Sequence, residues 1–193
     1  MPSSTPMADF SQKPIIEGER IVLRPLAPED AEAFHAAQDA ASQRFTGTRR
    51  TFSVAELRDW ATSRAVTTDR LDLAVVERAT GTWLGELAIN DWSPDDHSCN
   101  FRIALAPGGR DRGFGTEAAR LIVDYVFTHL PIHRISLDVF DFNPRAAHVY
   151  ERVGFVREGL LRDTLLWDGE YHSSIMMSIL RPDWAATRDG AIP

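Results

Sequence analysis

The feature that most constrains the fold is a segment that runs from an apolar strand through a glycine-rich turn into an amphipathic helix. Residues 103–116 read IALAPGGRDRGFGT, and the helix predicted for 116–130 places Ile122, Val126 and Leu130 on one face. An apolar helix face is buried against another layer, and the strand before it supplies that layer. The segment therefore predicts a sheet that is covered by helices.

The turn in this segment also has the chemistry of an anion-binding site. Backbone N–H groups at a helix start attract phosphate, and Gly113 and Gly115 let the backbone approach a ligand closely. Arg110 and Arg112 add positive charge. A Walker loop would need Gly-Lys-Ser/Thr here, and a dinucleotide fold would need Gly-x-Gly-x-x-Gly early in a βαβ unit; neither is present. On this motif alone, a tight turn with solvated arginines is the better explanation.

The rest of the chain predicts a mixed sheet with helices inserted between its strands. The hairpin at the end is indicated by Asp168-Gly169 between two apolar runs. The order of elements gives an α/β (α+β) fold with a mostly antiparallel sheet of about seven strands and about four helices. The predicted strands are 19–26, 71–77, 83–92, 99–106, 134–140, 155–166 and 170–180, and the predicted helices are 28–43, 53–66, 116–130 and 144–153.

Composition favours one domain and excludes several classes of function. A chain of 193 residues fits a single domain at 14–184, with a flexible arm at 1–13 and a tail at 185–193. One cysteine, Cys99, permits no disulfide framework or multi-cysteine metal site and fits the reducing cytoplasm. No apolar run approaches the about 18 residues of a membrane span. The formal charge of -7 has the wrong sign for nucleic-acid binding.

Several motifs, taken in order, resemble the GNAT N-acetyltransferases. Arg110-x-x-Gly113-x-Gly115 is similar to their acyl-CoA pyrophosphate loop. The resemblance covers roughly 17–184, is strongest to the RimJ/RimL-like branch that acetylates ribosomal proteins, and implies a sheet splayed between its fourth and fifth strands. The further segments that carry it are 17–25, 113–120, 133–135, 143–147, 150–155, 157–159 and 177–184.

The resemblance implies acetyl-CoA as cosubstrate and assigns residues to it. Leu105 would pair with pantetheine through its backbone, and Asn143 would bind from the other side. Tyr150 matches the family's tyrosine that protonates the departing thiolate, a role that suits a phenol because it is neutral at pH 7 and can donate a proton. By spacing alone Tyr150 is a core aromatic. The implied cofactor-binding residues are Ile103, Leu105, Arg110, Arg112, Gly113, Phe114, Gly115, Thr116 and Asn143.

The resemblance leaves the general base open. Acyl transfer to an amine needs the amine neutral, so a carboxylate or a water chain must remove a proton. The family commonly uses a glutamate on its fourth strand, but that position falls on Asn100. We predict Glu86, because a hairpin folded around Pro94 would set it nearly opposite Arg102. A salt bridge between Glu86 and Arg102 without a catalytic part is equally favoured. Further candidates are Asp91, Asp95, Asp96 and His97.

The predicted function is transfer of an acetyl group from acetyl-CoA to a primary amine by direct attack on the thioester, with no metal. The acceptor would be a protein N-terminus or a small amine, and the enzyme a cytoplasmic monomer or homodimer. A second interpretation, motivated by Asn100, is an acyl-CoA-binding module with weak or lost transferase activity. A third is a nucleotide-binding regulator that uses the Gly113 loop. Of the five tryptophans, Trp92 is expected nearest the acceptor.

Overall fold

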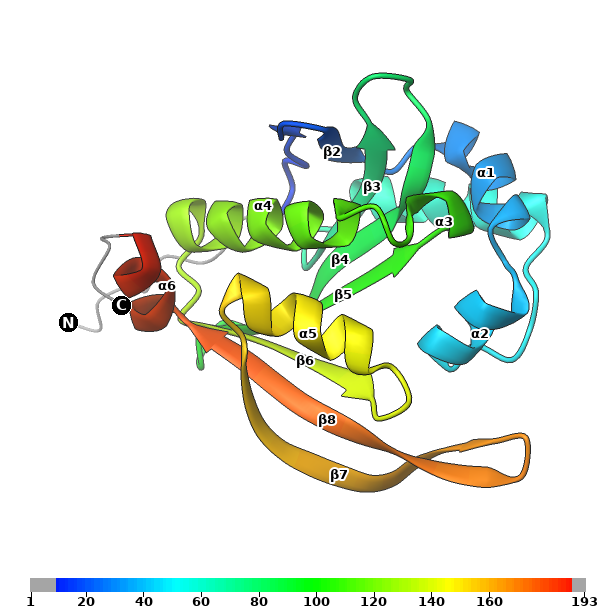
Figure 1. Cartoon of the computed structure of the whole chain (residues 1–193). Coiled ribbons are helices and arrows are strands. Elements are labelled where there is room, and N and C mark those ends of the chain that lie inside the picture. Colours follow the sequence, from blue (N-terminus) through cyan, green and yellow to red (C-terminus); the bar gives the residue numbers. More distant parts are fainter. Residues whose placement is uncertain (1–9, 189–193) are drawn as a thin grey trace.

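The computed structural model describes residues 10–188, which form one eight-stranded sheet with helices on both faces (Figure 1). The strand order is β1-β2-β3-β4-β5-β6-β8-β7. Neighbours in this order are antiparallel except for β5 and β6, which are parallel. The strands are β1 Ile16–Glu17, β2 Ile21–Pro25, β3 Leu71–Glu77, β4 Trp83–Ser93, β5 Ser98–Leu105, β6 Arg134–Phe140, β7 Val156–Trp167 and β8 Glu170–Leu180.

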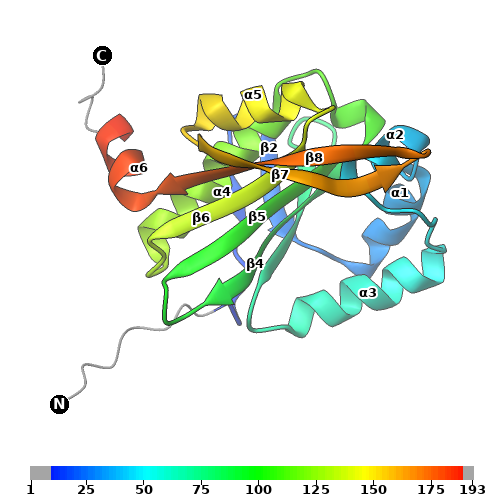
Figure 2. The same cartoon turned by 90° about the horizontal axis from the view of Figure 1, so that it is seen from below.

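The helices divide into two groups. In Figure 2, α4 and α5 lie on one side of the sheet and α3 on the other. No helix in the described range is long and apolar enough to cross a membrane. The helices are α1 Ala31–Ala36, α2 Ala40–Thr46, α3 Val54–Val66, α4 Phe114–His129, α5 Pro144–Val153 and α6 Arg181–Arg188, with short 3₁₀ turns at η1 Pro28–Asp30 and η2 Pro107–Gly109.

The strand period of two sends alternate residues to the two groups of helices. Leu87 of β4 and Phe101 of β5 belong to the large apolar core with α4 and α5. Ala74 of β3 belongs to a separate, smaller cluster with Ala61 of α3. Glu86 is on the Ala74 side, because these two residues are directly paired across β3 and β4. The sheet thus has one apolar face and one face that carries buried polar side chains.

The sheet opens between β5 and β6. The two strands pair only over their first three residues, from Ser98 with Arg134 to Asn100 with Ser136. The pairing of β5 with β4 continues as far as Leu105 with Gly85. Beyond Asn100 the outer edge of β5 therefore has no strand partner in the described part of the chain, and Figure 1 shows the two strands diverging. The splay expected between the fourth and fifth predicted strands is confirmed.

Two of the predicted helix starts are confirmed by their caps. Ser53 and Glu56 form a reciprocal capping box at the start of α3. Asn143 caps α5, with Pro144 at its first position and Gly154 in the left-handed conformation after its end.

The single helix predicted for 28–43 is wrong. The chain forms η1, α1 and α2 instead, with a break before Asp39. Asp39 adopts an extended conformation, and its carboxylate accepts a hydrogen bond from Ser42 N at 2.7 Å. An aspartate competes with helical backbone bonds in this way, so it starts a new helix instead of continuing the old one.

Residues just outside the predicted domain, 14–184, make contacts with it at both ends. Phe10 is fully buried against Trp92, at a ring separation of 6.1 Å. Lys13 Nζ donates to the carbonyl oxygens of Thr67 and Arg70 at 2.6 and 2.5 Å. Residues 10–13 therefore pack on the domain, because apolar burial and these hydrogen bonds hold them. At the other end α6 continues through Arg188, into the tail expected from residue 185. The rest of the predicted arm and tail, 1–9 and 189–193, lies outside the described residues.

Candidate active site

The turn between β5 and α4 presents unpaired backbone donors. Gly113 is the N-cap of α4 with φ 82°, a left-handed conformation that glycine adopts without strain. The first hydrogen bond of the helix runs from Glu117 N to Gly113 O at 3.2 Å. The N–H groups of Phe114, Gly115 and Thr116 thus have no acceptor within the helix and carry its positive dipole end. This arrangement fits the pyrophosphate expected from the sequence.

Both arginines of this turn are held by carboxylates. The Arg110 guanidinium contacts both oxygens of Asp39, at 3.2 and 3.1 Å, and holds the pKa of that carboxyl at about 2. Arg112 donates to Glu77 Oε1 at 2.6 Å. The arginines therefore tie the turn to α2 and to β3. Their positive charge, which the motif suggested would be free for an anion, is partly neutralised.

The Phe114 side chain belongs to the core, although its N–H group faces the turn. Its ring is 1% exposed, with the guanidinium carbons of Arg20 and Arg112 at 4.2 and 4.6 Å from the ring centroid. A backbone donor supported by a buried side chain is held rigidly, which favours binding of a fixed anion.

The open edge of β5 offers backbone groups to an extended ligand. Ala106 N donates to Leu84 O of β4 at 2.8 Å. Since successive residues of an antiparallel strand point their backbone groups to opposite sides, those of Ile103 and Leu105 point toward the gap. Leu105 O already accepts Arg110 Nε at 3.0 Å. The amide groups of pantetheine match the remaining backbone donors and acceptors of Ile103 and Leu105. Asn143, expected across the gap, uses its Oδ1 to accept from Ala146 N at 3.2 Å, and its contact with pantetheine stays a prediction.

Tyr150 lies on the apolar face of the sheet beside this gap. It belongs to α5, is 8% exposed and meets the ring of Phe101 edge to face at 6.1 Å. Burial, with a smaller effect of the Asp138 charge, raises the pKa of the phenol. Tyr150 therefore remains protonated at neutral pH, as a proton donor must.

Glu86 lies on the opposite face. Its side chain is 1% exposed and forms an ion pair with Arg102, and its Oε2 atom has no hydrogen-bond partner among residues 10–188. Burial raises the pKa of Glu86 against the opposing effect of Arg102. The predicted pairing of Glu86 opposite Arg102 differs from the observed pairing by two residues along β5. Glu86 is paired with Ala104 and reaches Arg102 diagonally, because the turn between β4 and β5 spans residues 94–97 and is centred beyond Pro94.

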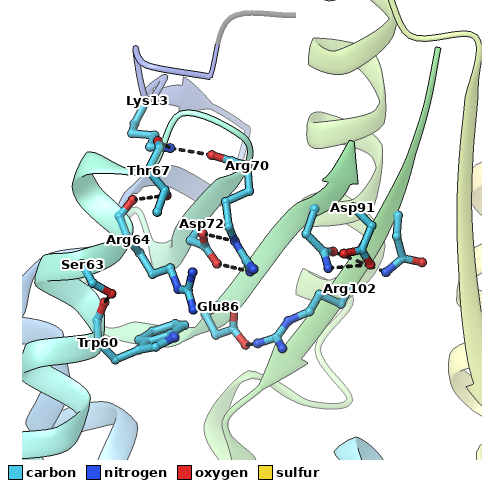
Figure 3. Close-up of polar contacts among 12 residues, drawn as sticks. Lys13, Trp60, Ser63, Arg64, Thr67, Arg70, Asp72, Glu86, Asp91 and Arg102 are labelled. Atoms are coloured by element: carbon cyan, nitrogen blue, oxygen red, sulfur yellow. Dashed lines mark hydrogen bonds and ion pairs between the residues drawn. The ribbon is translucent and has the colours of Figure 1, made fainter. Parts of the chain in front are cut away.

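Glu86 lines a cavity of about 550 Å³ between the sheet and the helices α1 to α3. Figure 3 shows Arg64 and Trp60 directed from α3 toward Glu86, which meets Arg102 from β5. Ala104 also lines the cavity, and its small side chain leaves room beside the gap. The aromatic residues of the wall are Phe34, Phe52, Trp60 and Trp83, and the charged ones are Arg50, Glu56, Asp59, Arg64, Arg70, Glu86 and Arg102.

Several other candidates lie away from this cavity. Trp92 packs on Phe10 and His97, away from this cavity, whereas Trp60 and Trp83 line it. That Trp92 is the tryptophan nearest the acceptor stays a prediction. Asn100 donates to Asn90 Oδ1 at 3.3 Å. Of the remaining candidates, Asp91 accepts from Asn90, Asp96 accepts from Ser93, and His97 Nδ1 contacts Pro131 O at 2.6 Å. Asp95 is not part of the cavity wall.

Thiol and metal chemistry have no obvious place in residues 10–188. Burial raises the pKa of Cys99 to about 12, so its thiol is not a ready nucleophile. No group of three or more His, Cys, Asp or Glu side chains in that range is arranged to hold a metal ion.

Comparisons with known proteins agree with this geometry. A family model described as acetyltransferase (GNAT) domain matches residues 20–156. The spermidine N(1)-acetyltransferase of Vibrio cholerae is 36% identical over 107 residues, which are 55% of this chain and 62% of that protein. The ribosomal protein uS5-alanine N-acetyltransferase of Escherichia coli is 28% identical over 92 residues, which are 48% and 47% of the two chains.

A solved structure extends the similarity to the whole fold. The crystal structure of spermidine N-acetyltransferase from Vibrio cholerae in complex with CoA and spermine superposes with a TM-score of 0.79 and 25% identity, over 87% of this chain and 99% of that one. The chain belongs to the GNAT family of acetyltransferases. It is an acetyl-CoA-dependent N-acetyltransferase, with coenzyme A as the carrier of the acetyl group.

Proposed function

We propose that the enzyme acetylates a small primary amine held in the cavity under α1 to α3, with Glu86 as the proton acceptor and Tyr150 as the proton donor. The observation that carries this proposal is the position of the two side chains. They lie on opposite faces of the sheet and contact β5, the strand that borders the opening toward β6: Tyr150 packs on Phe101, and Glu86 pairs with Arg102. A thioester placed in that opening is accessible from both faces.

The proposed reaction needs one proton removed and one supplied. The amine nitrogen attacks the thioester carbonyl carbon, so that a C–N bond forms and the C–S bond breaks. The proton that leaves the nitrogen passes to Glu86 Oε2, directly or through water, and the departing sulfur takes the phenol proton of Tyr150. The raised pKa of each group suits its role, because Glu86 then binds a proton more strongly and Tyr150 stays protonated.

The burial of the Glu86 carboxylate within the cavity supports a small acceptor. Glu86 is fully buried, and helices cover the site from one side. Among the relatives, one is named for spermidine and another for the N-acetylation of a ribosomal-protein alanine, so a protein N-terminus is the second candidate acceptor. The cytoplasmic location and the monomeric or homodimeric state stay predictions.

Two substitutions test the proposed roles. We expect Glu86→Gln and Tyr150→Phe each to lower kcat by about 100-fold, since a positioned acid or base contributes about 10² to 10⁴ in rate. The wild-type rate should rise with pH through the raised pKa of Glu86, and Glu86→Gln should remove this dependence. Stopped or continuous assays of thiol release across pH provide the measurement.

Glu158→Gln is the matched control. Glu158 also pairs with an arginine, Arg134, but lies on β7, away from the cavity. The Glu158→Gln variant should leave kcat and the pH profile of the reaction unchanged. An unaltered pH profile in Glu86→Gln would exclude Glu86 as the base. Binding of CoA by calorimetry without transfer to any amine would instead support an acyl-CoA-binding module.

A further inference from the structure

The cavity collects most of the buried polar atoms that lack a partner. In residues 10–188, four buried side-chain nitrogen or oxygen atoms have no hydrogen-bond partner in the protein. Three of them, Arg64 Nε, Trp83 Nε1 and Glu86 Oε2, belong to residues of the cavity wall. Such atoms are costly unless a ligand or water bonds to them. Their concentration in one cavity indicates a ligand with complementary groups.

A bulge in β4 brings two of these residues to the same face. Trp83 and Glu86 are an odd number of positions apart, so a regular strand would direct them to opposite faces. The register with β3 shifts at this point: Gly85 pairs with Val75, and Trp83 with Val76. Leu84 is therefore the extra residue, and Trp83 returns to the side of Glu86. Both then line the cavity that Arg64 closes from α3.

Arg64 is also the arginine of the cavity wall that has no carboxylate partner among residues 10–188. Arg50 pairs with Glu56 at 2.9 Å, Arg70 pairs with Asp72 at 2.7 Å, and Arg102 pairs with Glu86. For Arg64 the structure of residues 10–188 records only the Trp60 ring, 5.8 Å from the guanidinium carbon. An unpaired guanidinium and an indole N–H are both donors, so they complement an anionic acceptor group.

The acidic residues of the cavity wall do not form a binding site for a ligand with several positive charges. Glu56 and Glu86 are each neutralised by an arginine. Asp59 has no ion pair among the described residues and is exposed, so it lies at the rim. A polyamine would bring its additional ammonium groups toward four arginines, which is unfavourable at short range.

We propose that the acceptor is an amine that carries a carboxylate, an amino-acid-like molecule, with its carboxylate on Arg64 Nε and Trp83 Nε1 and its amine on Glu86 Oε2. This inference rests on the proposed function, because it takes the cavity as the acceptor site. Arg64 and Trp83 are then specificity-determining residues, and Glu86 keeps its role toward the reacting nitrogen.

The test compares amines that differ by one carboxylate. Acetyl transfer by the full chain is followed by thiol release with glycine against methylamine, 4-aminobutanoate against propylamine, and lysine against cadaverine; spermidine and a short alanine-terminated peptide are separate arms. We expect kcat/KM to be at least about tenfold higher for the carboxylate member of the best pair, since a charged hydrogen bond contributes about 10- to 100-fold in affinity.

Arg64→Met tests the residue. It should raise KM for the carboxylate member by about 10- to 100-fold with little change in kcat, and leave the matched amine unaffected. Trp83→Phe, which keeps an aromatic ring without the N–H, should shift KM in the same direction by less. Arg58→Met is the control, because Arg58 lies on the same helix, is exposed and is not part of the wall.

The outcomes separate the two proposals. Faster transfer to spermidine, to the peptide or to the carboxylate-free amines would overturn the inference and leave acetyl transfer in place. An equal effect of Arg64→Met on both members of a pair would also overturn it. If no amine is acetylated although CoA binds, the proposed function fails. Quenching of Trp60 and Trp83 fluorescence by added amines then tests the inference by itself. Binding of lysine and cadaverine with equal affinity would contradict it.

Discussion

On the face that carries α4 and α5, the sheet buries a continuous apolar layer, whereas on the face that carries α1 to α3 it buries charge. The first layer includes Phe101, Ile122 and Phe127, each 2% exposed or less. The second has a small apolar cluster and two carboxylates, Asp72 and Glu86, that are equally buried. Apolar burial supplies stability, and buried charge costs free energy unless it is paired. Most of the apolar burial that stabilises the fold therefore lies on one face of the sheet, and the buried carboxylates lie on the other.

At the opening between β5 and β6, paired strands no longer separate the two faces of the sheet. Elsewhere the paired strands separate the apolar core from the cavity. Beyond Asn100 that separation ends. Both side chains contact β5, the strand at the opening: Tyr150 packs on Phe101 on one face, and Glu86 pairs with Arg102 on the other. A site built from both faces combines a rigid support with polar groups that a core could not contain.

The largest expected effect distinguishes the two faces by stability. Ile122→Ala should lower the free energy of unfolding by about 3 to 4 kcal/mol, because Ile122 is fully buried in the close-packed layer. Leu57→Ala on α3 should cost only about 2 kcal/mol, since Leu57 borders the cavity and loses fewer contacts. Urea unfolding measures both values. An equal or larger loss for Leu57→Ala would contradict the assignment of stability to the α4 and α5 face.

A second, smaller effect concerns the turn before α4. Gly113→Ala should cost about 1 to 2 kcal/mol of stability, because an L-residue is strained at φ 82°, and should raise KM for acetyl-CoA. Gly81→Ala is the matched control: its φ is 71°, it has open space for a methyl group, and it lies in the turn between β3 and β4. Both variants should lose similar stability, and only Gly113→Ala should change KM. An unchanged KM would remove the turn from the acetyl-CoA site.

The smallest effect concerns the link between the turn and α2. The pKa of Asp39 is lowered from 3.8 to about 2 by Arg110, so its stabilising contribution is present above the ordinary pKa and is lost as the pH falls from about 4 to about 2. Asp39→Asn keeps a capping oxygen but should flatten this part of the curve of stability against pH. Asp59→Asn serves as the control, because Asp59 has no ion pair in the part of the chain that the structure describes. Identical acid profiles for Asp39→Asn and the wild type would show that the pair with Arg110 contributes nothing.

Local sequence signals predicted the elements well where the stabilising contacts are themselves local. The strand at 134–140 has the predicted bounds, and Ser53 with Glu56 cap α3 as expected. The break at Asp39 was missed, because part of its stabilisation comes from Arg110, 71 positions away. Trp83 and Arg64 were not predicted to line the cavity, because their positions there also depend on distant parts of the chain. Nothing local distinguishes Arg64 from Arg58, the exposed arginine of the same helix, and the bulge at Leu84 depends on pairing with β3.

Local patterns in the sequence were enough to indicate the class of the protein: the periodicities predicted a sheet covered by helices, and the glycines before α4 with the ordered motifs around them indicated an acetyl-CoA site. These signals are local, because caps, turns and amphipathic faces are set by residues a few positions apart. The faces that Glu86 and Tyr150 occupy became known only from the folded chain. The same is true of the cavity in which Arg64, Trp83 and Glu86 have polar atoms without a hydrogen-bond partner among residues 10–188. Those facts depend on strand register and on packing between distant segments, which no local pattern encodes.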